Sequence, residues 1–356
     1  MKKQLLNDIL KTTKADGILI YSPQNRFWFS RFNSSYGFIL YTANKTTLIL
    51  DGRYITMARE SKMLQNIDDL VLMKDPYQQL NELIKAHNIK TLLFESDWIN
   101  FSLYETFKQK LAASLQAYDF VKLRMCKDQW EIDQIKKACD ITHEVLKEVL
   151  DFIKVGMSEK EVARFVSDTF LKHGASKLSF DTIVASGPLN GSMPHAVPTD
   201  RIIEANDFVT LDMGCYFNGY CSDQTRTFAM SKNVDNKLKE IYQVVYDAQQ
   251  KGIDAIKPGV STGEIHKICF DHINEQGYGE YFTHGTGHGL GIEIHEWPYN
   301  AKGHNELLQP GMTVTIEPGI YIPGVGGVRI EDDILVTKTG HEFLTTPFRD
   351  LQIISK

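Results

Sequence analysis

Two aspartates flank a strong turn signal in the second half of the chain. Asp212 and Asp223 lie on either side of Asn218-Gly219, a dipeptide typical of a two-residue hairpin turn. Because side chains alternate between the two faces of a strand, such a hairpin places both aspartates on one face, one diagonal step apart. Two carboxylates at that separation repel each other unless a cation lies between them. The spacing therefore indicates a cation site, with two exposed acids beside a turn as the alternative.

Two glutamates also face each other across an expected hairpin. The turn-forming segment 323–327 is centred near Gly324, which lies midway between Glu317 and Glu331. Both glutamates lie within apolar, strand-like runs, where an unpaired carboxylate would be costly. A positively charged partner is therefore expected, either a bound cation or, as the alternative, a buried salt bridge with Arg329.

Histidines cluster in a glycine-rich stretch between the two pairs of acids. His284, His288 and His295 lie within twelve residues, interleaved with glycines that disfavour a helix and let the backbone approach a ligand closely. Of these, His288 can supply one neutral imidazole ligand. A single histidine is more often a polar surface or core residue, but three in such a stretch favour a site.

These residues together offer two aspartates, two glutamates and one histidine as ligands. Four carboxylates and one imidazole suit a pair of divalent cations, and carboxylates bridge metals readily. The oxygen-rich set favours Mn²⁺, although the general affinity order lets Co²⁺ or Zn²⁺ bind the same ligands. We therefore expect two divalent metal ions, held by Asp212, Asp223, His288, Glu317 and Glu331.

The remaining sequence predicts two domains. Strand-like and helical runs alternate through roughly the first 120 residues, which contain no cluster of reactive side chains. The expected strands there are 17–21, 37–41, 46–50 and 91–95, and the expected helices are 78–87 and 102–116. An apolar pattern of 3.6-residue period from about Lys127 to Ile153 then marks a long helix that opens the second domain. We expect an α/β (α+β) chain with domains at 1–122 and 123–356.

Composition and charge narrow the class of protein. The net charge of −6 argues against a nucleic-acid partner, which usually requires a basic face. No apolar run is long enough to span a bilayer, and the segment 1–10 fits a short amphipathic helix better than a secretory signal. The five cysteines are odd in number and show no CxxC spacing, as expected of reduced thiols. We therefore expect a cytoplasmic protein without a membrane partner.

The five expected ligands resemble those of a known family. Their order and local contexts (DMG, SDQTRT, GTGHGLG, IEPGIY and RIEDD) are similar to those of the M24 metallopeptidases of pita-bread fold, which include methionine aminopeptidase, aminopeptidase P and prolidase. The resemblance covers residues 122–350, and the first domain resembles the creatinase-like N-terminal domain of the proline-specific branch. It implies a pita-bread catalytic domain, a proline-containing peptide substrate and a homodimer.

The resemblance also assigns roles to residues around the ligands. The segment 192–198 (SMPHAVP) and the second inner histidine make His195 and His295 the candidates for contacting the scissile carbonyl and the departing proline. His284 matches a third, outer histidine. In the mechanism expected from these roles, Glu317 accepts a proton from the attacking water and the two inner histidines stabilise the oxyanion.

Each expected ligand also receives a place at the metal pair. Asp212 is expected to hold one metal, His288 and Glu317 the other, and Asp223 and Glu331 to bridge the two. Behind them, Arg329 should orient Glu331. Its apolar neighbours in the sequence argue against a surface position for this arginine.

One departure from the family pattern bears on the substrate. Prolidases often carry an arginine four residues after the equivalent of His295, where it holds the carboxylate of a dipeptide, and this chain has Tyr299 there. The tyrosine favours an Xaa-Pro aminopeptidase (aminopeptidase P), which releases the N-terminal residue of longer peptides. Xaa-Pro dipeptidase (prolidase) is the alternative. Metal-free relatives of the fold, which act as binding modules or as creatinase, are disfavoured by the intact ligand set.

Overall fold

The chain divides into two compact units. The computed structural model describes residues 2–347 and 350–354, and the division falls between Arg124 and Met125. The boundary expected from the sequence lies two residues earlier, between residues 122 and 123. Within the described ranges, no helix combines the length and the apolar character needed to cross a bilayer.

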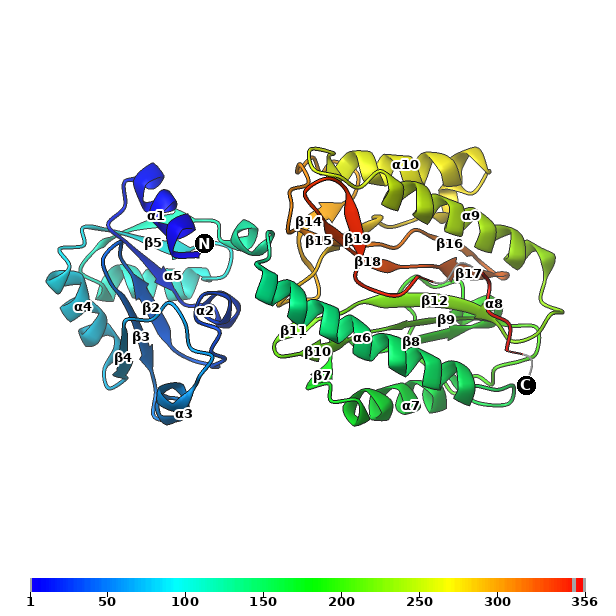
Figure 1. Ribbon diagram of the computed structural model, residues 1–356, viewed down its shortest axis with the longest axis horizontal. Helices are drawn as coiled ribbons and strands as arrows, with labels where there is room; N and C mark the ends of the chain where they lie inside the picture. Colours follow the sequence, from blue (N-terminus) through cyan, green and yellow to red (C-terminus); the bar gives the residue numbers. More distant parts are fainter. Residues whose placement is uncertain (1, 348–349, 355–356) are drawn as a thin grey trace. The chain divides into compact units, whose positions relative to one another are not determined.

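The first unit is a mixed six-stranded sheet covered by helices, in blue to cyan in Figure 1. The strands, in spatial order, are β4 (Asp69–Leu72), β3 (Thr46–Leu50), β2 (Phe38–Tyr41), β1 (Gly17–Ile20), β5 (Thr91–Glu95) and β6 (Ser114–Tyr118). The helices are α1 (Lys2–Thr13), α2 (Pro23–Ser30), α3 (Ile55–Glu60), α4 (Pro76–Ala86) and α5 (Phe101–Lys110), and the one-turn helix η1 (Val121–Arg124) ends the unit. Strand β1 pairs antiparallel with β2 and parallel with β5, so the sheet is mixed.

One prediction for this unit was wrong. The helix expected over 102–116 ends at Lys110, and Ser114–Tyr118 forms the edge strand β6, parallel to β5. The reason is tertiary. Backbone pairing with β5 is available to this segment, and it outweighs a helical pattern too short to be decisive. The other helices and strands expected in this unit are present, and none differs from its expected limits by more than three residues.

The second unit places strands between two pairs of helices. Figure 1 shows α6 (Gln129–Phe152) and α7 (Glu159–Lys172) along one side and α9 (Asn236–Asp254) and α10 (Thr262–Glu275) along the other. Its first strands are β7 (Lys177–Leu178), β8 (Ile183–Ser186), β9 (Phe208–Met213), β10 (Cys215–Phe217), β11 (Tyr220–Cys221) and β12 (Gln224–Ala229), with the short helix α8 (Gly187–Asn190) after β8. The later strands are β13 (Gly287–Gly289), β14 (Glu296–Asn300), β15 (Thr313–Ile316), β16 (Gly319–Ile322), β17 (Gly326–Arg329), β18 (Asp332–Val336) and β19 (His341–Phe343), with the one-turn helix η2 (Gly279–Tyr281) before β13.

The long helix expected to open the second domain is α6. Its first turn is fixed by a capping box, in which Asp128 and Glu131 each accept a hydrogen bond from the other's backbone N–H. Its apolar stripe is buried, and Val145, Leu146 and Val149 belong to one core cluster with strands β8, β9 and β12. Burial of that stripe holds the first half of the sheet against the helix.

The first expected hairpin has the predicted register. Residues Asn218 and Gly219 both have positive φ, 48° and 85°, as a tight hairpin turn requires. The pairing continues into β9 and β12, where Asp212 faces Thr225. Asp223 therefore lies one diagonal step from Asp212 on the same face.

The second expected hairpin keeps one register through an interruption. Strand β15 pairs with β18, β16 pairs with β17, and Glu317 and Glu331 lie opposite each other at the break between the two pairings. The sequence placed both glutamates inside strands, but their backbone N–H groups instead donate outside this hairpin, Glu317 to Thr286 O just before β13 and Glu331 to Thr225 O in β12. The break releases both side chains toward the first hairpin.

Candidate metal centre

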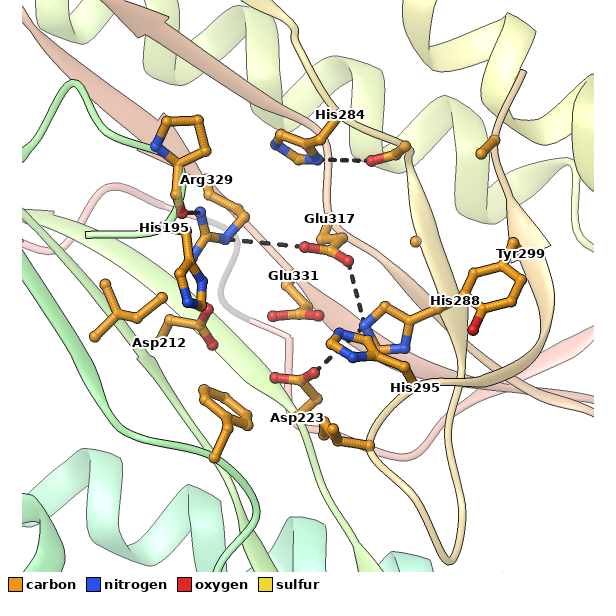
Figure 2. Close-up of a pocket in the computed structure, with 17 residues that line it drawn as sticks. His195, Asp212, Asp223, His284, His288, His295, Tyr299, Glu317, Arg329 and Glu331 are labelled. Carbon is orange, nitrogen blue, oxygen red and sulfur yellow. Dashed lines mark hydrogen bonds and ion pairs between the residues drawn. The ribbon is translucent and has the colours of Figure 1, made fainter. Parts of the chain in front are cut away.

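One cavity collects every residue singled out from the sequence. It has a volume of about 380 Å³ and lies in the second unit, between the two hairpins and the glycine-rich stretch. Its lining includes His195, Asp212, Asp223, His284, His288, His295, Tyr299, Glu317, Arg329 and Glu331 (Figure 2). Side chains that are separated by more than a hundred residues in the sequence thus meet in one place.

The ligand atoms of several residues converge at the floor of this cavity. One ligand atom each from Asp223, His288 and Glu331 lie within 4.8 Å of one another, and all three residues are buried. His288 Nε2 is 3.7 Å from Asp223 Oδ2 and 3.5 Å from Glu317 Oε1. Figure 2 shows Asp223, Glu317 and Glu331 grouped beside this imidazole, with Asp212 close by.

The hydrogen bonding of His288 leaves one nitrogen available as a ligand. Its Nδ1 lies 3.0 Å from the carbonyl oxygen of Gly289, which can only accept, so Nδ1 carries the proton. The lone pair of Nε2 then faces the carboxylates, as in a metal-binding histidine. Burial, with the nearby His295 adding to it, lowers the pKa of His288 to about 3, so the ring is neutral near neutral pH.

The carboxylates repel one another, and one buried arginine cannot balance all of them. Burial, followed by repulsion from Glu331 and Asp212, raises the pKa of Asp223 well above its usual range, and burial raises the pKa of Glu331 likewise. Burial also raises the pKa of Glu317 to about 7, despite the opposing effect of Arg329. Divalent cations relieve this repulsion by holding such carboxylates ionised.

Unsatisfied oxygen atoms point to the same conclusion. Among the side chains of the described residues, Asp212 Oδ1, Asp223 Oδ1 and Glu331 Oε1 are buried without a hydrogen-bond partner. A buried carboxylate oxygen without a partner is costly, and three of them around one cavity call for a common explanation. Oxygen ligands with one imidazole fit divalent cations, so the residues present suit a metal centre.

Arg329 lies behind this centre, but its contacts differ from the expected ones. Its Nη2 donates to Asp212 Oδ2 at 2.6 Å and its Nε lies 4.0 Å from Glu317 Oε2, so its direct carboxylate partners are Asp212 and Glu317 and not Glu331. It reaches Glu331 through Thr225, whose hydroxyl accepts from Arg329 Nε at 3.1 Å and donates to Glu331 Oε2 at 2.7 Å. The side chain is almost fully buried, so the surface alternative is excluded.

Sequence reasoning missed three supporting residues. Thr225 bridges Arg329 and Glu331, Tyr321 accepts from Arg329 Nη1 at 2.8 Å, and Asp333 Oδ2 accepts from the backbone N–H of Asp223 at 2.9 Å. The alternation of side chains along β12 was an available signal for Thr225, which faces Asp212 across the hairpin. The register of the second hairpin was a comparable signal for Tyr321, which lies one diagonal step from Arg329 across β16 and β17. Asp333 gave no such signal, because its partner Asp223 lies far away in the sequence.

The outer histidine is fixed between two partners. His284 Nδ1 lies 2.7 Å from Gly285 O, and its Nε2 lies 3.0 Å from the Tyr321 hydroxyl. Because the carbonyl must accept, Nδ1 carries the proton and the tyrosine O–H donates to Nε2. Burial, with Arg329 adding to it, lowers the pKa of His284 to about 4. This ring is therefore a neutral part of the cavity wall.

The two inner histidines lie on different sides of the acidic group. Figure 2 shows His195 beside Asp212, and His295 beside His288 and Asp223. The rings of His295 and His288 meet edge to face, with centroids 4.3 Å apart. Tyr299 lies beyond them and completes this wall. A substrate group over the acidic cluster would therefore be flanked by an imidazole on each side.

Comparison with known proteins places the chain in a family. Residues 133–338 match metallopeptidase family M24, and residues 2–126 match the Creatinase/Prolidase N-terminal domain. The chain is 37% identical to the Xaa-Pro dipeptidase of Pyrococcus furiosus over 99% of its own length and 100% of that protein. Among solved structures it resembles an Xaa-Pro dipeptidase from Bacillus anthracis (40% identity, TM-score 0.94, 99% of each chain). It also resembles an X-Pro aminopeptidase from Thermotoga maritima (32% identity, TM-score 0.89, 96% of this chain and 98% of that one).

These matches cover more than half of the chain, and the fold agrees with them along its whole length. The chain belongs to metallopeptidase family M24. It is a peptidase of pita-bread fold with a creatinase-like N-terminal domain, which confirms the fold class and the family expected from the sequence. Membership of this family implies divalent metal ions, in agreement with the cluster of Asp223, His288 and Glu331.

Proposed function

We propose that this chain is an Xaa-Pro aminopeptidase that removes the residue preceding proline from the N-terminus of longer peptides. The observation that carries the proposal is the lack of an available fixed cation in the cavity. Of the described lining residues, Arg329 is the one arginine, and no lysine is among them. Arg329 already donates to Asp212, Thr225, Tyr321 and Pro194 O. A dipeptide's C-terminal carboxylate would find no comparable partner, whereas a longer peptide has an amide there.

We assign five ligands to two divalent metal ions, with Mn²⁺ favoured by the oxygen-rich set and Co²⁺ or Zn²⁺ as alternatives. Asp212 would hold one ion, His288 and Glu317 the other, and Asp223 and Glu331 would bridge them. The convergence of their side chains and the unpartnered oxygens of three of them support this assignment. Such a pair supplies the Lewis acidity that makes water a competent nucleophile at neutral pH.

The chain's own side chains would carry the protons and orient the substrate. Glu317, whose pKa is about 7 before metals bind, is placed to accept the proton of the attacking water. His195 and His295 flank the acidic cluster, where they could donate hydrogen bonds to the developing oxyanion and to the proline nitrogen. Proline lacks an amide N–H and restricts its neighbour, so a dedicated cavity suits this bond.

A second candidate function is Xaa-Pro dipeptidase. Its support is the similarity to proteins of that name from Bacillus anthracis and Pyrococcus furiosus. Tyr299 takes the place where an arginine would serve a dipeptidase, and its ring contacts Trp297 and His304 at centroid distances of 5.5 and 5.6 Å. The tyrosine hydroxyl presents no positive charge to a carboxylate, and for that reason we favour the aminopeptidase.

Cell location and assembly belong to the same proposal. The five cysteines are all free thiols, as is usual in a reducing compartment, and this supports the cytoplasm. A homodimer is proposed by resemblance to the family, with peptides as the only proposed partners besides a second copy. Size-exclusion chromatography with light scattering measures the assembly directly.

A peptide panel with controlled metal content tests the proposed function. After chelation the protein should cleave nothing, and added Mn²⁺ should restore cleavage of an Xaa-Pro-Xaa tripeptide well above that of the Xaa-Pro dipeptide. Asp223→Asn should stay inactive with Mn²⁺ present, whereas Asp200→Asn, which alters an exposed aspartate paired with Lys160, should match the unmodified protein. A preference for the dipeptide would favour the second candidate. Full activity of Asp223→Asn would overturn the site.

A further inference from the structure

The loop that carries His295 is built around a buried carboxylate. Residues 290–295 connect β13 to β14 without regular secondary structure, and Glu296 begins β14 directly after the histidine. Glu296 is 3% exposed, and its Oε1 accepts the backbone N–H groups of Ile292 and Glu293, each at 3.2 Å. The carboxylate therefore satisfies two loop amides from inside the turn, in the way a cap satisfies the end of a helix.

A buried lysine balances the charge of this carboxylate. Lys127 Nζ lies 3.3 Å from Glu296 Oε2, and both side chains are 1% exposed. The ammonium group also donates to Met125 O at 3.3 Å. The cation at the second oxygen, Oε2, offsets the cost of burying the negative charge, while Oε1 is already bonded to two amides. Both oxygens of the Glu296 carboxylate therefore have partners. Removing either partner would leave the other charge buried and unbalanced.

The loop fits closely over this ion pair. A Cβ atom added to Gly291 would come within 2.8 Å of Glu296 Oε2 and 2.9 Å of Lys127 Cε, so the backbone passes directly over both side chains. On its other side the loop is bonded to β11, because Gly291 O accepts the backbone N–H of Cys221 at 2.8 Å. The backbone leading to His295 is thus held between the Glu296–Lys127 ion pair on one side and β11 on the other.

Glu296 itself stays out of the cavity. It is absent from the described lining residues, whereas His295, its neighbour in the chain, lines the cavity and meets the ring of His288. Any effect of Glu296 on the reaction must therefore pass through the loop. Of this loop, His295 carries the side chain that reaches the acidic cluster, so Glu296 would affect the reaction by changing the position of the His295 imidazole.

We propose that Glu296, charge-balanced by Lys127, is a positioning residue that fixes the His295 imidazole over the substrate. The proposal rests on the proposed function, since it assigns His295 to the scissile bond. A displacement of about 1 Å in such a group can cost on the order of 100-fold in rate. The ion pair itself takes no proton from the substrate and holds no metal.

A double-mutant cycle tests whether Glu296 acts through His295. His295→Ala and Glu296→Ala should each lower kcat/KM for an Xaa-Pro-Xaa tripeptide by roughly 10- to 100-fold. The loss should appear mainly in kcat, because the histidine serves the transition state. The double variant should be no slower than His295→Ala alone. If the two losses instead multiply, Glu296 acts by another route and the proposal is overturned.

Conservative variants separate positioning from general loss of structure. Glu296→Gln keeps an acceptor for the two amides and should retain kcat within about threefold when combined with Lys127→Met, which removes the unbalanced charge. Glu296→Asp keeps the charge but withdraws the acceptor by one methylene, so it should lose kcat like Glu296→Ala. If Glu296→Ala fails to fold, Glu296→Asp takes its place in the double-mutant cycle. Asp200→Asn, which alters an exposed aspartate outside this loop, is the control and should stay within about twofold.

Metal content distinguishes the possible failures. Each variant should bind as much Mn²⁺ per chain as the unmodified protein, because none alters an assigned ligand. If the unmodified protein fails to cleave any Xaa-Pro peptide, the proposed function is wrong. The positioning role of Glu296, which rests on that function, is then wrong with it. If it cleaves them while Glu296→Asp retains full kcat, the proposed function stands and the positioning role is wrong.

Discussion

At the scale of single residues, the centre depends on how its second layer holds the ligands. Arg329 binds Asp212 directly and reaches Glu331 through the hydroxyl of Thr225, so one guanidinium orients carboxylates from both hairpins. Because the donors are fixed by burial, the carboxylates keep their free oxygens directed into the cavity. The arginine therefore orders the ligands without supplying the charge that two divalent cations would bring.

The titration of Glu317 gives a prediction for the metal-free protein. Burial raises its pKa to about 7, whereas an unfolded chain loses the same proton near pH 4.3. Between these values the folded state binds more protons, so the contribution of Glu317 to the free energy of unfolding is fully present below about pH 4.3 and is lost as the pH rises to about 7. Relative to Glu317→Gln, the metal-free protein should lose on the order of 3 kcal/mol across this window.

Urea unfolding of the chelated proteins at several pH values measures this difference. His288, with its pKa lowered to about 3, has the opposite dependence, because its contribution is lost as the pH falls below about 6.5. That contribution is present in both proteins and largely cancels in the comparison. Glu342→Gln, which alters an exposed glutamate paired with Lys136, should show a flat difference. A difference for Glu317→Gln that rises with pH would contradict the assignment.

At the scale of secondary-structure elements, a close approach of strands places the histidine ligand. Gly287, in β13, precedes His288, and a Cβ atom added to it would lie 2.0 Å from the carbonyl oxygen of Thr315 in β15. The neighbour is backbone and cannot move aside alone, so the strands can be this close only with glycine at this position. The same approach lets Glu317, which follows β15, reach the imidazole.

Gly287→Ala should therefore remove the centre while the rest of the unit stays folded. The strands must separate, which moves His288 away from Glu317, so we expect at least 10-fold weaker Mn²⁺ binding and a destabilisation of about 1–3 kcal/mol. Gly277→Ala is the control, because its φ of 84° is positive, as is the φ of 155° at Gly287, but nothing lies within 4 Å of the added atom. It should cost about 1 kcal/mol and leave metal binding unchanged. Calorimetric metal titration and thermal unfolding of both variants would decide, and unweakened binding in Gly287→Ala would refute the argument.

Secondary-structure elements differed in how well the sequence alone predicted them. The two hairpins were predictable because their turns and the two-residue period fix which carboxylates share a face. The short strand β6 was not, because its pairing with β5 is a tertiary contact that no local pattern records. For the same reason Asp333 escaped notice, since it meets Asp223 only after distant segments fold together. Tyr321 could have been found, because it lies one diagonal step from Arg329 within the predicted second hairpin. The direct bond from Arg329 to Asp212 was not foreseen, because the role of this arginine was assigned by its nearness in sequence to Glu331.

At the scale of the whole molecule, the two units have separate cores. An apolar cluster of the first unit surrounds β1, β2 and β5, and the two large clusters described for the second unit consist of residues beyond 124. Every residue assigned to the metal centre also belongs to the second unit. Ligands that bind only the folded form of one unit stabilise that unit by mass action. The metals should therefore stabilise the two units unequally.

Hydrogen exchange followed by mass spectrometry measures this inequality peptide by peptide. With Mn²⁺ at about 100 times its dissociation constant, opening that releases the metals becomes about 100-fold rarer, which corresponds to about 2.7 kcal/mol. Core amides that exchange only when the second unit opens should slow by that factor, with the strands that carry Asp212 and His288 among them. Peptides from residues 2–124 should exchange at the same rate with and without metal.

In Asp223→Asn neither unit should gain protection, which separates binding at the centre from loose association of the ion elsewhere. Equal protection of both units in the unmodified protein would mean that they unfold as one body, and the separate cores would then not define separate stabilities.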